Sequence, residues 1–257
     1  MNILRELWDR RALIWSFALS DLKIRYRNSI LGFFWTLLEP LLIMFVLYMV
    51  FTNIFKSQIE HFGLYLLIGI IMWNMFSRGT EMAMNSILAK GNLLTHIYFP
   101  TEIPAISSVI TSSLMLFFEI VVFLLFMIFF QFVPPATIVF LPLVLMLEII
   151  LVLGISLPLS VLNVRYRDIQ FIWRVVLQIG FFVTPIFYKL DILPDNIQNI
   201  LKYSPIAQII DMGHDLSLNN KIPSSESITI TIVITLSIFA VGYAIFYKSQ
   251  KRIVEEL

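Results

Sequence analysis

Six long apolar stretches alternate with short polar segments along the chain. Each stretch is long enough for a helix that crosses the hydrocarbon core of a membrane, which takes about 20 residues. The pattern predicts an all-α polytopic membrane protein, in which a single transmembrane domain fills residues 1–257. The six predicted spans are residues 30–52, 62–88, 103–132, 137–162, 169–188 and 228–247.

Residues 3–22 predict a further helix that lies in the membrane surface. Apolar side chains recur at helical spacing on one face, and opposite charges stand four residues apart on the other. Trp8 and Trp15 lie on the apolar face, which suits the boundary with the lipid headgroups. The alternative is a helix that packs against another protein domain.

The segment between the fifth and sixth spans, residues 190–223, carries signals for two short helices. A proline precedes the first, over residues 195–203. Ser204-Pro205 combines an N-cap residue with a proline at the first helical position, and it opens the second helix over residues 206–216. Neither helix is long enough to cross a membrane. We therefore expect an external re-entrant or surface-lying helix pair.

Three of the spans contain a proline beyond their first two turns, namely Pro40, Pro158 and Pro185. Each proline leaves a carbonyl one turn earlier without its usual partner and so favours a kink. Three kinked helices suggest a bundle that bends around a cavity.

The basic residues are distributed unevenly over the two sides of this topology. Fourteen of the eighteen Lys and Arg fall before the first span, around the second and fourth junctions between spans, or behind the last span. Basic residues are enriched on the cytoplasmic side of membrane proteins. Both termini are therefore expected to be cytoplasmic. The four basic residues on the other side are Lys56, Lys189, Lys202 and Lys221.

Composition excludes several functions. The chain is 59% hydrophobic and 14% charged, whereas a soluble domain carries about 25% charged residues. A net charge of +1 gives no reason to expect a nucleic-acid partner, and the absence of Cys removes thiol chemistry. No Gly is followed by Lys, so there is no phosphate-binding Walker loop, and no pattern of metal ligands or catalytic residues occurs. We expect no catalytic residue, no metal site and no cofactor in this chain.

Four carboxylates lie within the apolar stretches: Glu39, Glu81, Glu119 and Glu148. A carboxylate in a membrane is costly unless it is paired, hydrogen-bonded or protonated. Glu119 and Glu148 fall near the midpoints of spans three and four, where a polar substrate path and a structural bond to another helix are equally open. Glu81 is close to Arg78 in the sequence, so we expect Glu81 to have a structural role.

One face of the first span combines an aromatic ring with polar groups, because Trp35, Thr36 and Glu39 share it by helical spacing. Sugar recognition uses aromatic rings against apolar faces and acceptors for hydroxyl groups. The alternative is an aromatic that faces lipid. Just before this span, Lys23, Arg25 and Arg27 form a basic run that suits anionic lipid headgroups.

The loop of residues 93–104 is unusually apolar for a cytoplasmic loop. An exposed apolar loop indicates a protein partner or burial at the membrane surface.

Three stretches together resemble the ABC-2 type permeases, and more narrowly the branch that exports lipid-linked polysaccharides such as O-antigen, capsule and teichoic acid. The first is DLKIRYRNSILGFFW at residues 21–35, which runs on to EPLL at 39–42. The second is YFPTEIP at residues 98–104. The third is NVRYRDI at residues 163–169, followed by TPIFY at 184–188.

This resemblance implies a half-transporter in the bacterial cytoplasmic membrane that pairs with a second copy and with two ATP-binding cassette subunits, which bind ATP and Mg. It also implies that residues 3–22 lie beside a lateral opening for a lipid-linked polysaccharide, and that the helix pair within residues 190–223 is an external gate. The coupling element that docks on the ATPase would contain Leu94, His96, Tyr98, Phe99 and Pro100.

Two other functions remain open at this point. An ion-coupled secondary transporter would use Glu119 and Glu148 as proton carriers. A membrane enzyme acting on lipid-linked sugars would need a catalytic cluster, and the sequence shows none. Co-purification with an ATPase separates the permease from the secondary transporter.

Overall fold

The computed structural model describes residues 8–53, 59–96 and 99–256, and within these ranges it is all helical, with no strand. The all-α prediction is therefore confirmed. The elements in order, with η for 3-10 turns, are α2 (Arg11–Arg25), α3 (Phe34–Asn53), α4 (Phe62–Ala89), α5 (Gly91–His96), α6 (Glu102–Phe129), η1 (Ala136–Phe140), α7 (Leu141–Arg165), α8 (Ile169–Val183), η2 (Leu190–Ile192), α9 (Asp195–Leu201), α10 (Pro205–Ser217) and α11 (Ser225–Glu256).

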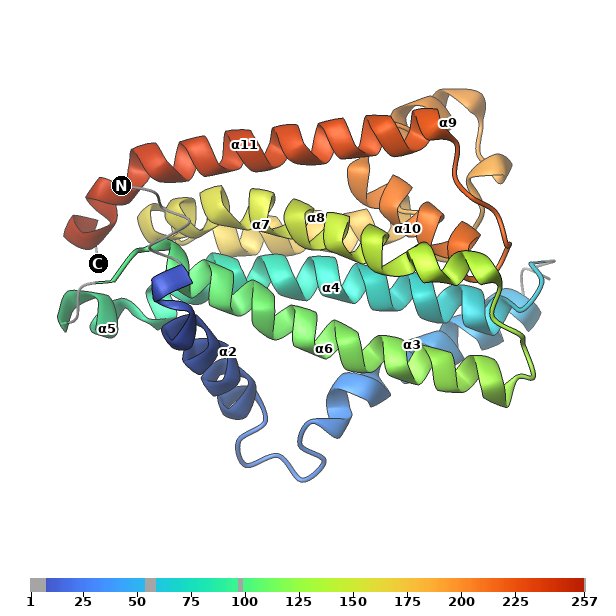
Figure 1. Cartoon of the computed structure of the whole chain (residues 1–257), viewed down its shortest axis with the longest axis horizontal. Coiled ribbons are helices and arrows are strands. Elements are labelled where there is room, and N and C mark those ends of the chain that lie inside the picture. The colour runs from blue at the N-terminus through green and yellow to red at the C-terminus, as the bar shows by residue number, and fades with distance from the viewer. Residues whose placement is uncertain (1–7, 54–58, 97–98, 257) are drawn as a thin grey trace.

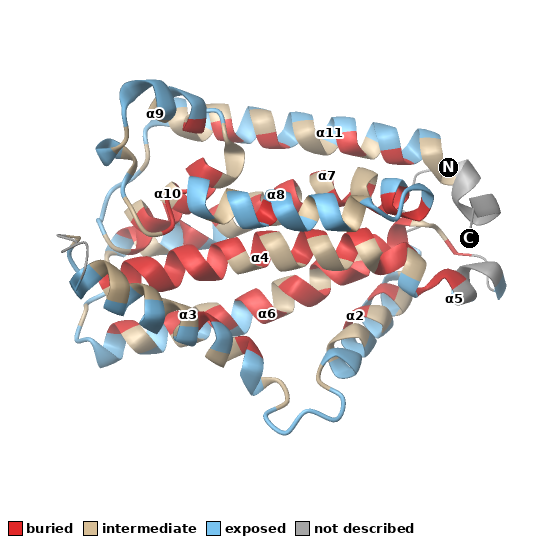
Figure 2. Ribbon diagram, turned by 180° about the vertical axis from the view of Figure 1, so that it is seen from behind, coloured by how far each residue is buried: buried red, intermediate tan, exposed pale blue. Residues whose placement is uncertain are grey.

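The central helix of the bundle is α4, which packs against α3, α6, α7, α8 and α10. Figure 2 shows buried residues along almost its whole length, whereas α3, α8 and α11 carry many exposed residues. The exposed side chains on these outer helices are mostly large and apolar. An apolar exterior around a packed centre is typical of a helix bundle in lipid.

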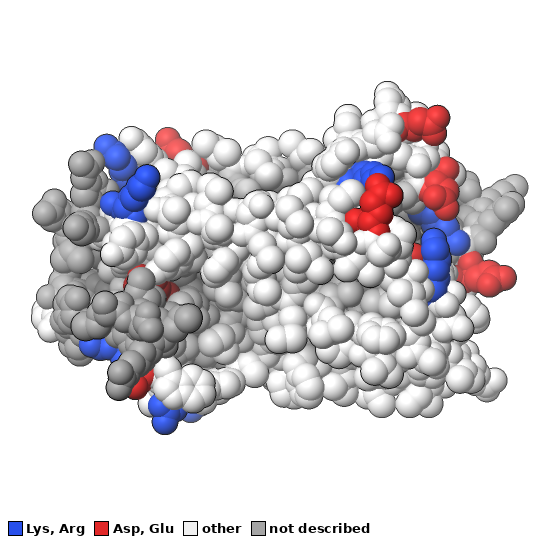
Figure 3. All heavy atoms as spheres, turned by 45° about the horizontal axis from the view of Figure 1, so that its top comes forward, with Lys and Arg blue, Asp and Glu red and all other residues white. Residues whose placement is uncertain are grey.

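Among the described residues, five helices are long and apolar enough to cross a membrane: Phe34–Asn53, Phe62–Ala89, Glu102–Phe129, Ala136–Arg165 and Ser225–Gln250. They match five of the six predicted spans. Figure 3 shows that Lys, Arg, Asp and Glu gather at the two ends of the molecule, with a broad band free of them between. This uncharged band is the part of the surface that suits a hydrocarbon environment.

The fifth predicted span, residues 169–188, forms a shorter helix than expected. Its helix α8 ends at Val183, so it has 15 residues and a length of about 22 Å at the usual rise, against a hydrocarbon core of about 30 Å. The prediction that Pro185 kinks this helix is wrong, because the helix ends before it. Thr184 is extended, with φ −79° and ψ 144°, as the residue before a proline favours. Pro40 and Pro158 do lie inside helices, α3 and α7.

Close contact between α7 and α11 depends on two glycines. A Cβ atom on Gly242 would meet the carbonyl oxygen of Gly154 at 1.9 Å, and a Cβ on Gly154 would meet the backbone of Phe239 at 2.7 Å. Glycines that let backbones approach are a recurrent feature of membrane helix pairs. The long helix α11 is held mainly by this contact with α7.

Two short helices follow α8, as predicted, but they differ in burial. α9 is exposed on most of its surface, whereas α10 is buried against α4 and α7. The ring of His214 on α10 stacks on Tyr65 of α4, with ring centroids 3.7 Å apart and an angle of 6° between the planes. In Figure 1 this helix pair lies at the opposite end of the bundle from α2 and α5.

Candidate functional site

A small polar cavity of about 150 Å³ lies at the junction of the C-terminal end of α2 with α3 and α4. It brings together Arg25 and Glu39, two residues that the sequence assigned separately to lipid headgroups and to a substrate path. A cation and a carboxylate on one cavity wall can together bind hydroxyl and phosphate groups. The cavity is lined by Arg25, Glu39, Asn74, Ser77, Arg78, Glu81 and Met82.

The predicted face of α3 divides into an exposed and a buried part. Trp35 is 45% exposed and Glu39 is exposed as well, so both are accessible to a substrate. Thr36 is 2% exposed, and its hydroxyl forms a hydrogen bond with that of Tyr26 in the turn after α2. The expectation that Thr36 lines a path is therefore wrong, because its side chain ties α3 to the preceding turn.

Glu119 belongs to an ion pair inside the bundle. Arg78 of α4 donates from Nη1 and Nη2 to its two carboxylate oxygens, at 2.9 and 3.1 Å. The Glu119 side chain is fully buried, and that of Arg78 is 10% exposed. A two-pronged Arg–carboxylate pair is strong and directional. Of the two interpretations left open by the sequence, the geometry favours a structural bond between α4 and α6.

The sequence pattern placed Arg78 near the cytoplasmic boundary of the second span, beside Glu81. It lies within α4 and pairs across to α6. Glu81 instead faces Arg174 of α8, at 3.8 Å. Both side chains of that second pair are partly exposed, so their attraction is weakened by solvent.

Glu148 of α7 is fully buried, and neither of its carboxylate oxygens has a hydrogen-bond partner among the described residues. The charges of Glu119 and Arg78 act on it. The Nε of Arg78 is likewise buried without a partner in the described part of the chain. Ionisable side chains from α4, α6 and α7 thus lie inside the same bundle. Its position inside the helix bundle gives Glu148 no contact with the cavity beside Glu39.

The basic run before α3 is exposed, as a headgroup site requires. Lys23 and Arg25 lie in the last turn of α2, where cations favour the negative end of the helix dipole, and Arg27 follows in the turn. All three side chains are exposed.

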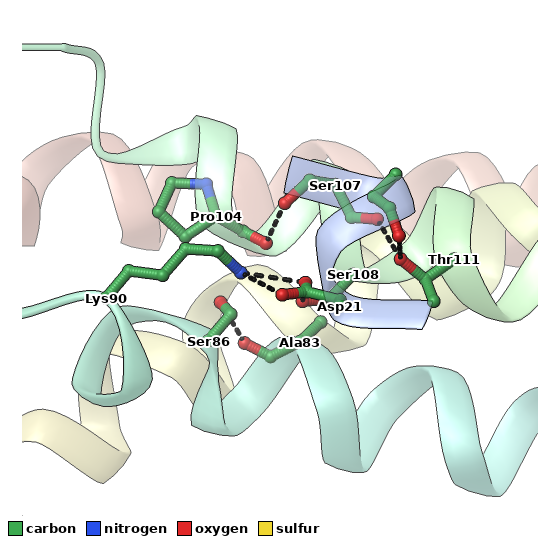
Figure 4. A network of polar contacts seen from close by, with 9 residues as sticks. Asp21, Ala83, Ser86, Lys90, Pro104, Ser107, Ser108 and Thr111 are labelled. Carbon is green, nitrogen blue, oxygen red and sulfur yellow. Dashed lines mark hydrogen bonds and ion pairs between the residues drawn. The ribbon is translucent and has the colours of Figure 1, made fainter. Parts of the chain in front are cut away.

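The predicted interfacial helix covers Arg11–Arg25 in the structure, while residues 3–7 of the prediction lie outside the described residues. The polar contacts in Figure 4 hold this helix against other helices of the same chain. Lys90, just behind α4, donates to both oxygens of Asp21 on α2, at 3.0 and 2.7 Å. The hydroxyl of Thr111 on α6 donates to the carbonyl of Ala18 at 3.1 Å. These contacts hold α2 against the ends of α4 and α6.

The predicted coupling element lies beside this fastened helix. Leu94 and His96 are on α5, where His96 is exposed and the side chain of Leu94 lies outside the described part. Tyr98 lies outside the described residues. Phe99 is only 5% exposed, and its ring packs edge-on against Phe17 of α2, 5.5 Å between centroids. Phe99 therefore offers no free ring to a partner. Pro100 is half-buried.

The sequence did not suggest the Asp21–Lys90 pair or the match of Arg78 with Glu119. The second had a usable signal, since charges within membrane spans are expected to pair with one another. That rule selects no partner by itself, and sequence proximity favoured Glu81. The first joins residues 69 positions apart, which a local pattern cannot reveal.

The chain is similar to known proteins over nearly its whole length. The sequence model of a family described as ABC-2 type transporter matches residues 12–215. An O-antigen export system permease protein RfbA of Klebsiella pneumoniae is 29% identical over 238 residues, covering 92% of each chain. The protein of the same description from Myxococcus xanthus is 26% identical, with 100% of both chains covered. Polysialic acid transport protein KpsM of Escherichia coli is 23% identical and covers 92% of this chain.

Proposed function

The chain belongs to the ABC-2 type transporter family, and from this premise we propose that it exports a lipid-linked, O-antigen-like polysaccharide across the bacterial cytoplasmic membrane. It is a permease subunit, and ATP hydrolysis belongs to a separate ATPase subunit. The observation that carries the proposal is the end-to-end similarity to O-antigen export permeases, which spans nearly all of both chains.

The substrate meets the permease at the polar cavity beside α3. The exposed ring of Trp35 offers a flat apolar face to a sugar, and Glu39 offers an acceptor for hydroxyl groups. Arg25 offers a cation to the phosphate that joins a glycan to its lipid. Lys23 and Arg27 extend this basic surface toward anionic headgroups.

The chain crosses the membrane six times, with α8 and the bent segment behind it as the fifth crossing. The excess of basic residues at the end that holds the termini supports a cytoplasmic location for that end. In this orientation α9 and α10 form an external re-entrant pair that gates the exit. An impermeant thiol reagent applied to intact cells should label Asn199→Cys and not Ser249→Cys. The reverse pattern would invert the orientation.

The working transporter contains a second copy of this chain and two ATPase subunits, which bind ATP and Mg. The apolar exposed faces of α3 and α8 are available to the second copy or to lipid. The ATPase docks on the region of α5 and the loop after it. There His96 is exposed and Phe99 couples the loop to α2 through Phe17. Movement of the ATPase would thus reach α2 and the cavity at its end.

Isolation of the chain with its partners tests this function. Purified from its native membrane, the permease should bring an ATP-binding cassette subunit with it, and His96→Cys should cross-link to that subunit. Asn199→Cys, at the other end of the bundle, serves as the matched control and should not. Absence of any ATPase from a preparation that still transports glycan would overturn the proposal.

A further inference from the structure

A second polar cavity, of about 450 Å³, lies at the outer end of the bundle between η2, α9, α10 and the start of α11. Its volume falls in the range of pockets that hold small molecules. Nothing in the proposed function uses it, since the cavity of Arg25 and Glu39 lies where α2 joins α3 and α4, at a distance along the bundle (Figure 1).

His214 lines this cavity and carries a buried acceptor without a partner. Its Nε2 lies 3.0 Å from the carbonyl oxygen of Tyr65, which can only accept, so Nε2 carries the hydrogen. Burial, together with the nearby charge of Lys189, lowers the pKa of His214 to about 3, and the ring is neutral. Its Nδ1 is therefore a bare acceptor. His214 is 1% exposed, and Nδ1 has no partner among the described residues.

A second free acceptor stands one helical turn earlier on α10. The carboxylate of Asp211 has no hydrogen bond or ion pair within the described part of the chain. The neighbouring Asp215 is satisfied, because Asn219 donates to it at 2.9 Å and Lys221 lies at 3.5 Å. Nδ1 of His214 and the carboxylate of Asp211 can therefore both accept hydrogen bonds from a ligand in the cavity.

The remaining lining sets the charge of that ligand. Lys189, Lys202 and Lys221 line the wall together with three aspartates, Lys202 is paired with Glu226 at the start of α11 at 2.7 Å, and Asn199 and Gln208 add amide groups that both donate and accept. Three ammonium groups disfavour a metal cation, and the polar wall disfavours an acyl chain. A neutral molecule with many hydroxyl groups fits this lining. Its hydroxyl groups can donate to the two acceptors without a partner and accept from the amide and ammonium groups, and the wall carries charges of both signs.

We propose that this outer pocket is a carbohydrate-binding subsite, in which sugar hydroxyl groups donate to Asp211 and to Nδ1 of His214. The proposal rests on the proposed function and deepens it, since the exported glycan is the carbohydrate at hand. Each protomer then holds the emerging polymer at α10, the helix that also packs against α4 and α7. Bound sugar at α10 resists backward movement of the chain between cycles.

Equilibrium binding tests the subsite in the permease–ATPase complex in lipid nanodiscs. The probe is radiolabelled free oligosaccharide, released by mild acid from the lipid-linked glycan of the cells that make this permease. Wild-type complex should bind it saturably. Asp211→Leu should weaken binding about tenfold or more, the loss expected for a hydrogen bond to a charged group. Asn199→Leu, an exposed lining change that cannot disturb packing, should weaken it several-fold.

The matched control is Asp195→Leu, an exposed aspartate on α9 outside the pocket lining, which should bind like the wild type. Equal affinity in wild type, Asp211→Leu and Asn199→Leu would overturn the subsite, as would binding that EDTA abolishes. If the ATPase co-purifies but no saturable binding occurs, the subsite fails and the export function stands. If no ATPase co-purifies with a permease that still transports glycan, the proposed export function is overturned, whatever the binding result.

Discussion

Arg78 and Glu119 meet in the centre of the helix bundle through two parallel hydrogen bonds, although 41 positions separate them in the sequence. They tie α4 to α6, the helix against which α2 packs. A buried pair of this kind is costly to form and more costly to break, because removal of one charge strands the other. This geometry therefore favours a structural role for Glu119, as the partner of Arg78, over a role as a proton carrier.

Glu119→Gln should destabilise the permease by about 3–5 kcal/mol, since it leaves the buried guanidinium of Arg78 without its counter-charge. Glu148→Gln is the matched control. It makes the same substitution at an equally buried position whose oxygens have no partner in the described chain, and it should be neutral or stabilising. Thermal unfolding in detergent, followed by size-exclusion chromatography, measures both. Equal melting temperatures for the two variants would refute the structural role of Glu119.

The double variant Arg78→Leu/Glu119→Leu should regain much of the stability lost in either single change. A pair of apolar side chains leaves no stranded charge in the bundle. The coupling energy from the complete cycle should be large compared with that of the partly exposed pair of Glu81 and Arg174. Simple additivity of the two single changes would show that they do not interact.

Lys90→Met should loosen α2 from the bundle while the spans stay folded. Lys90 holds both oxygens of Asp21 and lies 5.3 Å from the ring of Phe17, so its loss removes two contacts with α2. Ala18 of α2 is fully buried, and the chain has no native Cys. The rate at which a maleimide labels Ala18→Cys should therefore rise several-fold. Lys23→Met, exposed on the same helix, should leave the rate unchanged.

Gly242→Ala should destabilise the packing of α11 on α7 by about 1–3 kcal/mol, because its Cβ has no space beside the carbonyl of Gly154. Gly63→Ala is the matched control. A Cβ there has its nearest neighbour at 3.9 Å, an ordinary contact. The melting temperatures of the two variants should differ by several degrees. A Gly242→Ala variant as stable as Gly63→Ala would disprove the close approach of the two helices.

Asp211 should make stability depend on pH. Burial, followed by the charges of Asp215 and Asp191 and opposed by Lys221, raises its pKa from 3.8 to about 6. Lys189 and the neutral His214 complete its surroundings. The folded state therefore binds a proton more tightly than the unfolded state. The stabilisation from that proton is complete below pH 4 and is lost as the pH rises through about 6.

Asp211→Asn has no charge to bury. At pH 7.5 it should be more stable than the wild type by up to about 3 kcal/mol, the equivalent of the pKa difference. The advantage should shrink as the pH falls and vanish near pH 4. Melting curves of both proteins across this range measure it. A gain that is constant with pH would show that the carboxylate does not titrate with folding.

The apolar pattern was sufficient to predict most of the fold, because a membrane span needs a long uncharged stretch and little else. Five spans and the helices α9 and α10 fall where the pattern placed them. The exception was α8, where hydropathy continues through Phe187 and Tyr188 but Pro185 ends the helix. Hydropathy measures the environment of a residue, whereas backbone sterics decide where a helix ends.

The site was less predictable, because it depends on contacts between distant segments. Helical spacing put Thr36 on the same face as Trp35 and Glu39, yet Tyr26 lies close enough to bury its hydroxyl. The sequence placed Phe99 in an exposed apolar loop, whereas in the structure its ring packs against Phe17 of α2. The neighbours of both residues follow only from the packing of α2 onto the bundle.

Reconstituted export tests the central claim most directly. The permease and its ATPase would be placed in liposomes with the lipid-linked glycan, and transported glycan would be counted by cleavage with an impermeant glycosidase. We predict that ATP drives transport without an imposed proton gradient, that Trp35→Ala lowers it sharply at normal protein level, and that Glu148→Gln retains it. Transport that a proton gradient drives without ATP, and that Glu148→Gln abolishes, would contradict the account.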